Sequence, residues 1–314
     1  MIAKFNLHTR RSFFRQCSAL LAAGLALKPH SHLLAADAPP EGFRSLFDGK
    51  TTAGWHAMPR AQPNKNRPAN APGDPNSQYE RALRSRGKWT VQDGVLIGEQ
   101  DPPASGFGGY LVSDEKFGDF ELLIDAKPDW AVDTGVLVRT TPLGNVGIQM
   151  LIDHRRSGGI GGFYGNGLAG FHAVPYQFNA IFDKDGKPIG LQEEDPKTTI
   201  ESGSEAKRRL LSYAAPVGEF LKAWKFGDWN TFRIRCVGEL PKLTTWINGT
   251  KICELDTAKI EWPKFDPKEM LAQIGRRGHL SLEVHSNGPT DPLGKDRWAP
   301  GAVCRWRNIF IREL

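Results

Sequence analysis

Most of the chain consists of short runs of β-branched and aromatic residues separated by tight-turn pairs, a pattern typical of antiparallel β-sandwiches. The clearest runs are 120–126, 135–139, 146–152, 231–237, 243–247, 280–284 and 309–311. The turn pairs are Asp48-Gly49, Asp93-Gly94, Asp185-Gly186 and Asn248-Gly249. Asp-Gly and Asn-Gly favour the turns that join antiparallel strands. We therefore predict an all-β antiparallel β-sandwich with long loops.

The first 36 residues have the pattern of an export signal. The run Thr9-Arg10-Arg11-Ser12-Phe13 fits the twin-arginine motif, and the apolar run 19–27 that follows is too short to span a bilayer. Small residues at 35–36 suit cleavage by a signal peptidase. We expect export by the twin-arginine route to the periplasm or beyond, and a single domain over residues 37–314.

The charge of the chain lies mostly in this signal. The sequence has 41 Lys and Arg against 35 Asp and Glu, a formal net charge of +6. Residues 1–36 contain no acid and five bases, which are Lys4, Arg10, Arg11, Arg15 and Lys28. The remainder is nearly neutral and has no apolar run of membrane-spanning length, so we expect no nucleic-acid partner and no transmembrane segment in the mature chain.

Three other patterns carry little chemistry. Cys236, Cys253 and Cys304 are odd in number and lack zinc-ligand spacing, so they indicate neither a disulfide framework nor a zinc site. The glycine-rich run 158–165 lacks the Gly-Lys-Ser/Thr of a phosphate loop. Asp183-Lys184-Asp185-Gly186 resembles half a calcium loop, but the later acidic ligands are missing and a hairpin turn is the better interpretation.

Two long regions interrupt the strand pattern. Residues 58–86 are rich in Pro, Asn and Arg and are expected to form a surface excursion. Residues 158–226 form the second region, in which only 216–224 has helical periodicity. Its part 176–225 has the character of an insertion, which either covers a site or decorates an edge.

Alternation along two strands predicts a polar face. Side chains in a strand point alternately to opposite sides, so Glu283 and His285 share the face opposite Leu280, Leu282 and Val284. By the same rule Gln149 and Asp153 lie opposite the apolar residues of 146–152, and Arg139 ends the preceding strand. A solvated strand face or a structural ion pair would explain each of these residues alone; together they suggest one site.

Several motifs, in this order and spacing, resemble those of a known family. They are Gly42 to Gly49, Gly54-Trp55, Trp89 to Leu96, Gly118 to Leu122, Gly227 to Asn230, Leu243 to Thr250, Gly278 to His285 and Trp306 to Ile309. The chain beyond residue 41 is similar to the 3-keto-disaccharide hydrolase domain family. The resemblance implies a jelly-roll, concanavalin A-like sandwich, with Arg139, Gln149, Asp153, Glu283 and His285 on one concave surface.

The resemblance also implies a substrate already oxidised to a ketone at C3 of a glucosyl unit. That ketone acidifies the C2 proton, so a base can start β-elimination at C1, and hydration completes a net hydrolysis. The candidate base is His285; Arg139 would stabilise the enolate, and Glu283 or Asp153 would assist the leaving group or hold a divalent ion. No spacing signature identifies a metal. The candidate sugar-binding residues are Gln149, Tyr164, Trp55, Trp130 and Trp298.

The chain departs from the family at two acidic positions. It has Val146-Gly147-Ile148-Gln149 where the family commonly has Tyr-Glu-Val-Gln, and it has Glu283 where Gln is usual. This is consistent either with a relocated acid or with lost activity. Two alternatives therefore stay open: a lectin-like binding module, and a direct glycoside hydrolase, which would need two carboxylates flanking the bond. Glu121 and Asp125 share a strand face, but Leu123 stands between them.

Overall fold

The computed structural model describes residues 37–61, 77–200, 204–287 and 296–314. The described residues all belong to one compact unit. The predicted export signal, residues 1–36, lies outside the described residues. No helix in the described parts of the chain is long and apolar enough to cross a membrane.

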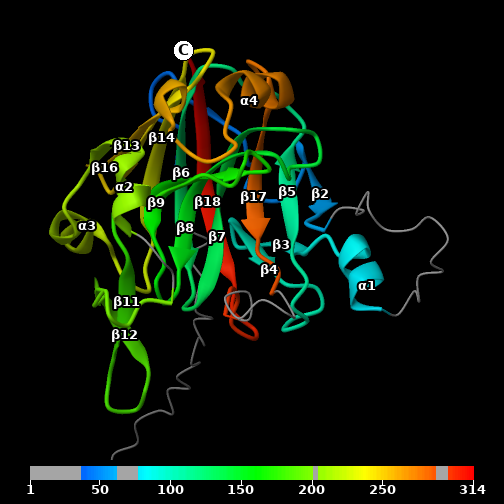
Figure 1. The fold of residues 1–314 in the computed structure, drawn as a ribbon. Helices are drawn as coiled ribbons and strands as arrows, with labels where there is room; N and C mark the ends of the chain where they lie inside the picture. Colours follow the sequence, from blue (N-terminus) through cyan, green and yellow to red (C-terminus); the bar gives the residue numbers. More distant parts are fainter. Residues whose placement is uncertain (1–36, 62–76, 201–203, 288–295) are drawn as a thin grey trace, which may run out of the picture. The chain divides into compact units, whose positions relative to one another are not determined.

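Two antiparallel sheets pack face to face (Figure 1). Within the described residues the first sheet has nine strands in the order β13-β16-β15-β14-β6-β18-β4-β3, with β1 also paired to β18. Its strands are β1 (Arg44–Ser45), β3 (Lys88–Gln92), β4 (Val95–Glu99), β6 (Phe120–Pro128), β13 (Leu211–Ala214), β14 (Asn230–Val237), β15 (Lys242–Ile247), β16 (Thr250–Asp256) and β18 (Cys304–Glu313).

The second sheet has seven described strands in the order β10-β9-β8-β7-β17-β5-β2. They are β2 (Trp55–Pro59), β5 (Gly109–Ser113), β7 (Val132–Thr140), β8 (Gly147–His154), β9 (Ile160–Asn166), β10 (His172–Ala173) and β17 (His279–Val284). A separate hairpin pairs β11 (Phe178–Phe182) with β12 (Pro188–Glu193). The helical segments are α1 (Gln78–Arg84), α2 (Ser204–Arg209), α3 (Val217–Ala223), α4 (Pro267–Ile274) and the 3₁₀ turn η1 (Thr257–Lys259).

The core lies between the sheets and follows the predicted alternation. Leu280, Leu282 and Val284 of β17 are buried in it with Ile148 and Met150 of β8. Each predicted strand overlaps an observed one, so the antiparallel sandwich is confirmed. The opposite faces of β8 and β17 are therefore free to carry polar groups.

The long second region is more regular than its composition suggests. It contains β9 to β13 and α2 to α3, and the helix predicted at 216–224 is α3. The glycine-rich run was expected outside the strands, but most of it is β9. A side chain at Gly162 would lie 2.5 Å from the carbonyl oxygen of Ala173, and one at Gly165 would lie 2.3 Å from the ring of Phe171. These glycines allow close packing in a sheet.

The structure also tests the predictions for the turn at 183–186 and for the excursion at 58–86. Asp183 accepts backbone hydrogen bonds from Asp185 and Lys187, which closes the predicted hairpin turn between β11 and β12. In the first region, α1 occupies residues that were expected to lack periodic structure; Ser77 caps its first turn by accepting from the Glu80 amide.

Glu121 and Asp125 lie on the outer face of β6 among cations. Glu121 accepts from Arg233 and Arg312, each over 2.6 Å, and Asp125 accepts from Arg307 and Asn308. Burial acts to raise the pKa of Glu121, but the arginines outweigh it and the pKa is lowered. These carboxylates therefore serve a structural network.

Candidate active site

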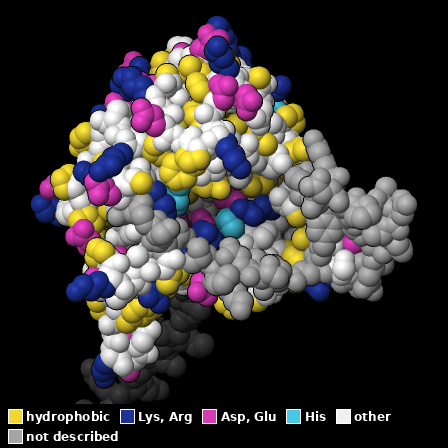
Figure 2. All heavy atoms as spheres, in the orientation of Figure 1, with side chains coloured by type: hydrophobic (Ala, Val, Ile, Leu, Met, Phe, Trp, Pro, Cys, Tyr) yellow, Lys and Arg dark blue, Asp and Glu magenta, His cyan; other side chains and the backbone are white. Residues whose placement is uncertain are grey.

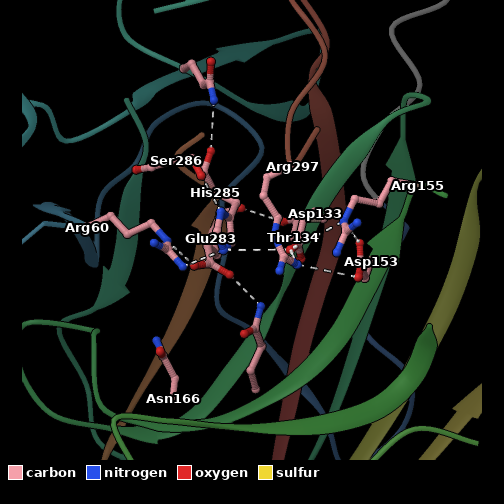
Figure 3. Close-up of polar contacts among 12 residues, drawn as sticks. Arg60, Asp133, Thr134, Asp153, Arg155, Asn166, Glu283, His285, Ser286 and Arg297 are labelled. Carbon is pink, nitrogen blue, oxygen red and sulfur yellow. Dashed lines mark hydrogen bonds and ion pairs between the residues drawn. The ribbon is translucent and has the colours of Figure 1, made fainter. Parts of the chain in front are cut away.

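A polar cluster lies on the outer face of the second sheet. Figure 2 shows a hollow in this face of the molecule with histidine, arginine and acidic side chains on its floor. Figure 3 shows the residues that converge there from β7, β8 and β17 and from two loops. At the centre is Glu283 of β17, whose side chain is only 1% exposed.

Both carboxylate oxygens of Glu283 are held by donors. Nε of Arg60 donates to Oε1 over 2.6 Å, and Nε2 of Gln149 donates to Oε2 over 2.6 Å. Arg60 follows the end of β2, whereas Gln149 comes from β8. Burial acts to lower the pKa of Arg60, but Glu283 outweighs it and the pKa is raised. A buried carboxylate requires such partners, so Arg60 stays a cation beside it.

Arg60 also contacts His285. Its Nη2 donates to Nε2 of His285 over 2.6 Å, while Nδ1 of the imidazole donates to the Ser286 carbonyl over 2.6 Å (Figure 3). This pairing fixes the tautomer, because a carbonyl can only accept and Nε2 must then carry the lone pair. Burial and Arg60 lower the pKa of His285 to about 4, against the opposing effect of Asp133. The imidazole is thus neutral and carries its lone pair on Nε2.

The second half of the cluster is centred on Asp133 of β7. Its Oδ2 accepts from Nη1 of Arg297 over 2.6 Å and lies 3.8 Å from Nε2 of His285. Arg155 is 4.0 Å from the same oxygen and 2.8 Å from Oδ1 of Asp153. Burial acts to raise the pKa of Asp133, but His285, Arg297 and Arg155 outweigh it and lower the pKa to about 2. Asp133 is therefore ionised.

The charges in this cluster balance. Its three carboxylates are Glu283, Asp133 and Asp153, and its three guanidiniums are Arg60, Arg155 and Arg297. No group of three or more His, Cys, Asp or Glu suited to hold a metal ion occurs among the described residues. Each of the three carboxylates lies against a guanidinium, whose positive charge repels a divalent ion, so these residues do not fit one.

Four of the predicted site residues lie in the cluster: His285, Glu283, Asp153 and Gln149. Tyr164 of β9 pairs with Gln149 and contacts His172 at a ring-centroid distance of 5.6 Å. Burial raises the pKa of Tyr164, while Arg60 and Arg297 act in the opposite direction, which places its hydroxyl within the electrostatic reach of the cluster. Its hydroxyl stays protonated near neutral pH.

Arg139 is not part of the cluster. Its guanidinium donates to Asp119 over 2.9 Å and to the carbonyls of Gly118 and Glu239. The cause is a bulge: β7 has one residue more than β17 between Leu137 and Thr140, and Arg139 takes a left-handed φ of 51° there. Gly278 permits this conformation, since a Cβ at that position would lie 2.5 Å from the Arg139 carbonyl carbon. The prediction that Arg139 lies beside Glu283 on one concave surface is therefore wrong.

The predicted stacking residues Trp55 and Trp298 are core residues. Trp55 is 8% exposed and donates to the Leu46 carbonyl over 2.8 Å; Trp298 is 1% exposed and donates to Ala302 over 2.8 Å. Neither presents a ring face of sufficient area for a sugar. Trp130 is only partly buried and belongs to a different surface, described below.

Sequence reasoning missed Arg60, Asp133, Arg155 and Arg297. Asp133 alternates with Gly135 and Leu137 on β7, but the strand was predicted to begin at residue 135. Had the predicted strand begun three residues earlier, the same alternation would have placed Asp133 on the polar face. Arg60 and Arg297 lie in loops, where no periodicity predicts the direction of a side chain.

The profile of the 3-keto-alpha-glucoside-1,2-lyase-like domain family matches residues 42–312. The chain belongs to this family. The match covers all the described strands except the end of β18, and it includes every residue of the cluster. This family member thus has a carbohydrate-active, lyase-like domain, as the motifs indicated. No curated protein matches the chain.

Several solved structures resemble this family member. A putative glycosyl hydrolase from Parabacteroides distasonis has 16% identity, with 87% of this chain and 94% of that chain covered and a TM-score of 0.45. A carbohydrate-binding module from Bacillus subtilis has 9% identity, coverage of 72% and 92%, and a TM-score of 0.35. A β-glucanase from Bacillus licheniformis has 8% identity, coverage of 72% and 82%, and a TM-score of 0.37.

Proposed function

We propose that the protein cleaves the glycosidic bond of 3-keto-glucosides by removing the C2 proton, eliminating the C1 substituent and hydrating the product. The observation that supports this most strongly is the neutral His285, whose Nε2 carries a lone pair and lies 2.6 Å from Nη2 of Arg60. In such a substrate the C2 proton and the C3 oxygen are on neighbouring carbons. A base and a cation side by side match that pair of groups.

Arg60 has a direct role in this proposal. When the C3 oxygen accepts from Nη2, the hydrogen bond to His285 is released and Nε2 is free to take the C2 proton. The C2–H electrons form the C2=C3 bond of an enolate, and the negative charge on the C3 oxygen lies against the guanidinium. Arg60 thus replaces Arg139 as the group that stabilises the enolate.

The leaving group departs in the second step. The C3 carbonyl re-forms as the C2=C3 electrons move to C1=C2, and the C1–O bond breaks. The proton on Nε2 of His285 is available to the departing oxygen, which returns the imidazole to its neutral form. Water then adds across C1=C2, with hydroxyl at C1 and hydrogen at C2, and the net result is hydrolysis.

Glu283 and Asp153 act as acceptors in this scheme. Glu283 lies 2.6 Å from Nε of Arg60, and Asp153 lies 2.8 Å from Nε of Arg155. We assign them the positioning of the cations instead of the acid role first expected. Gln149 fixes the second oxygen of Glu283 and so orients the Glu283–Arg60 pair.

The assay uses purified protein with 3-keto-trehalose or 3-keto-sucrose, and trehalose or sucrose as controls. We expect 3-keto-glucose or its 2-hydroxyglucal from the oxidised sugars alone. His285→Ala should lose roughly 10²- to 10⁴-fold in kcat, with circular dichroism unchanged. Turnover of the unoxidised sugars would indicate a direct glycoside hydrolase, and binding of the oxidised sugars without turnover would indicate a lectin-like module.

We also propose export through residues 1–36. The motif Thr9-Arg10-Arg11-Ser12-Phe13 with the apolar run after it supports the twin-arginine route. Replacement of Arg10 and Arg11 by Lys should keep the protein in the cytoplasm of an expressing bacterium. Fractionation with unchanged periplasmic yield would contradict this.

A further inference from the structure

We infer that the pocket beside the cluster, bounded by Trp130, Phe182, Asn179, Ala299, Pro300 and Arg155, binds an aromatic leaving group of the glycoside. This inference rests on the proposed function, because a leaving-group site has meaning only where a glycosidic bond breaks. The cavity measures about 480 Å³, within the usual range for a small-ligand site.

The pocket is continuous with the cluster through two elements. Arg155 is in its wall and also lies 2.8 Å from Asp153 and 4.0 Å from Asp133. Asp296 and residues 298–300 line the same pocket, and Arg297, which lies between them in the sequence, donates to Asp133. A group attached to a sugar held at His285 therefore has a bounded space next to it.

The lining favours a planar apolar ring over a second sugar. The rings of Trp130 and Phe182 meet edge to face, with centroids 6.5 Å apart and an interplanar angle of 80°. Phe182 is 50% exposed although it is a large hydrophobic side chain, and it projects from the β11–β12 hairpin. An edge-to-face pair with one open ring offers the surface on which another aromatic ring packs. Ala299 and Pro300 extend the apolar wall.

The charged residues of the wall are Arg155, Arg156 and Asp296. Of these, Arg155 suits the departing atom, because its side chain is fixed by Asp153 beside the cluster. A phenolic leaving group carries negative charge on its oxygen as the C1–O bond breaks, and a nearby guanidinium stabilises that charge. An aryl glucoside oxidised at C3 therefore matches both parts of the site: its keto sugar suits the cluster, and its aromatic leaving group suits the pocket.

The test compares 4-nitrophenyl 3-keto-α-glucoside with 3-keto-trehalose, for the wild type, Phe182→Ala and the control Ile181→Ala. Ile181 is the preceding residue of the same strand and is 40% exposed, so the two truncations disturb the hairpin similarly. We expect Phe182→Ala to raise KM for the aryl substrate about fivefold and to leave KM for 3-keto-trehalose unchanged. For Ile181→Ala, we expect the KM values for both substrates to equal those of the wild type.

Three results would overturn the inference. Equal rises in KM for both substrates would show a site for a second sugar, and unchanged KM for both would show that the pocket binds no leaving group while the proposed function stands. If the wild type turns over neither substrate, the proposed function fails. Calorimetric titration with the aryl substrate then tests the pocket by itself: affinity lost in Phe182→Ala alone supports binding of an aromatic group there, without a leaving-group role, and equal affinity in all three proteins overturns that as well.

Discussion

Nη2 of Arg60 donates to Nε2 of His285 over 2.6 Å, so a cation and a neutral base share one hydrogen bond at the centre of the cluster. The same guanidinium donates from Nε to Glu283. Arg60 is thus bound in two directions, and only its contact with His285 needs to change when a ketone oxygen arrives.

Arg60→Lys should lower kcat on a 3-keto-disaccharide roughly 10²- to 10³-fold. A lysine ammonium lacks the planar fork that meets Glu283 and the C3 oxygen together, although it keeps the charge. Arg276→Lys is the matched control, because Arg276 is exposed and pairs with Glu239, and neither residue belongs to the cluster. Equal activity of both variants with the wild type would remove Arg60 from the mechanism.

The pH profile should reflect the lowered pKa of His285. Only the neutral imidazole accepts a proton, so kcat/KM should stay constant as the pH falls through 6.5 and should decline as it falls through about 4. Circular dichroism at each pH separates titration from acid unfolding. An acidic limb centred near pH 6.5 would mean that Nε2 is not held as the structure shows.

Arg139→Met should affect stability instead of chemistry. Arg139 is 1% exposed and its variant leaves Asp119 and two carbonyls without their donor, so we expect a loss of about 3 kcal/mol in the free energy of unfolding. Denaturant titration measures the loss, and kcat on the folded fraction should be unchanged. A large fall in kcat at full stability would instead restore the role first assigned to Arg139.

His154→Phe should reduce the acid dependence of stability. Burial lowers the pKa of His154 to about 4, against the weaker effect of Asp129, and rings of Trp130, Trp224 and Phe226 surround it. The unfolded state takes up a proton near pH 6.5 while the folded state stays neutral. The folded state therefore loses about 3 kcal/mol of stability as the pH falls from 6.5 to 4.

The measurement is the free energy of unfolding at several pH values for His154→Phe and the wild type. A phenyl ring fits among the surrounding rings but does not titrate, so the variant should lack this loss even if its overall stability is lower. Parallel slopes for the two proteins between pH 6.5 and 4 would show that His154 does not cause the acid dependence.

Period-two alternation predicted the part of the site that lies in regular strands. Glu283, His285, Gln149 and Asp153 share a face because β8 and β17 keep their register along these residues. The same rule was wrong for Arg139, where a bulge with a left-handed residue turns the side chain away. A bulge depends on pairing between strands distant in sequence, which one strand's pattern does not contain.

The remaining errors also have physical causes. Trp55 and Trp298 were assigned to sugar binding by residue type, but a large aromatic side chain gains most from burial in the core, and both rings are there. Arg60 and Arg297 act from loops, and their directions are set by Glu283 and Asp133. Such partners become evident only once the sheets bring them together.

The most direct test of the account uses 3-keto-trehalose labelled with deuterium at C2 of the oxidised ring. Removal of the C2 proton by His285 predicts slower turnover of the labelled substrate and release of 3-keto-glucose that has lost the label, with free labelled product incubated in parallel to measure spontaneous exchange. The contradicting result is equal rates for the labelled and unlabelled substrates, together with released 3-keto-glucose that keeps as much deuterium at C2 as the free labelled product incubated in parallel. That result would show that the glycosidic bond breaks without removal of the C2 proton.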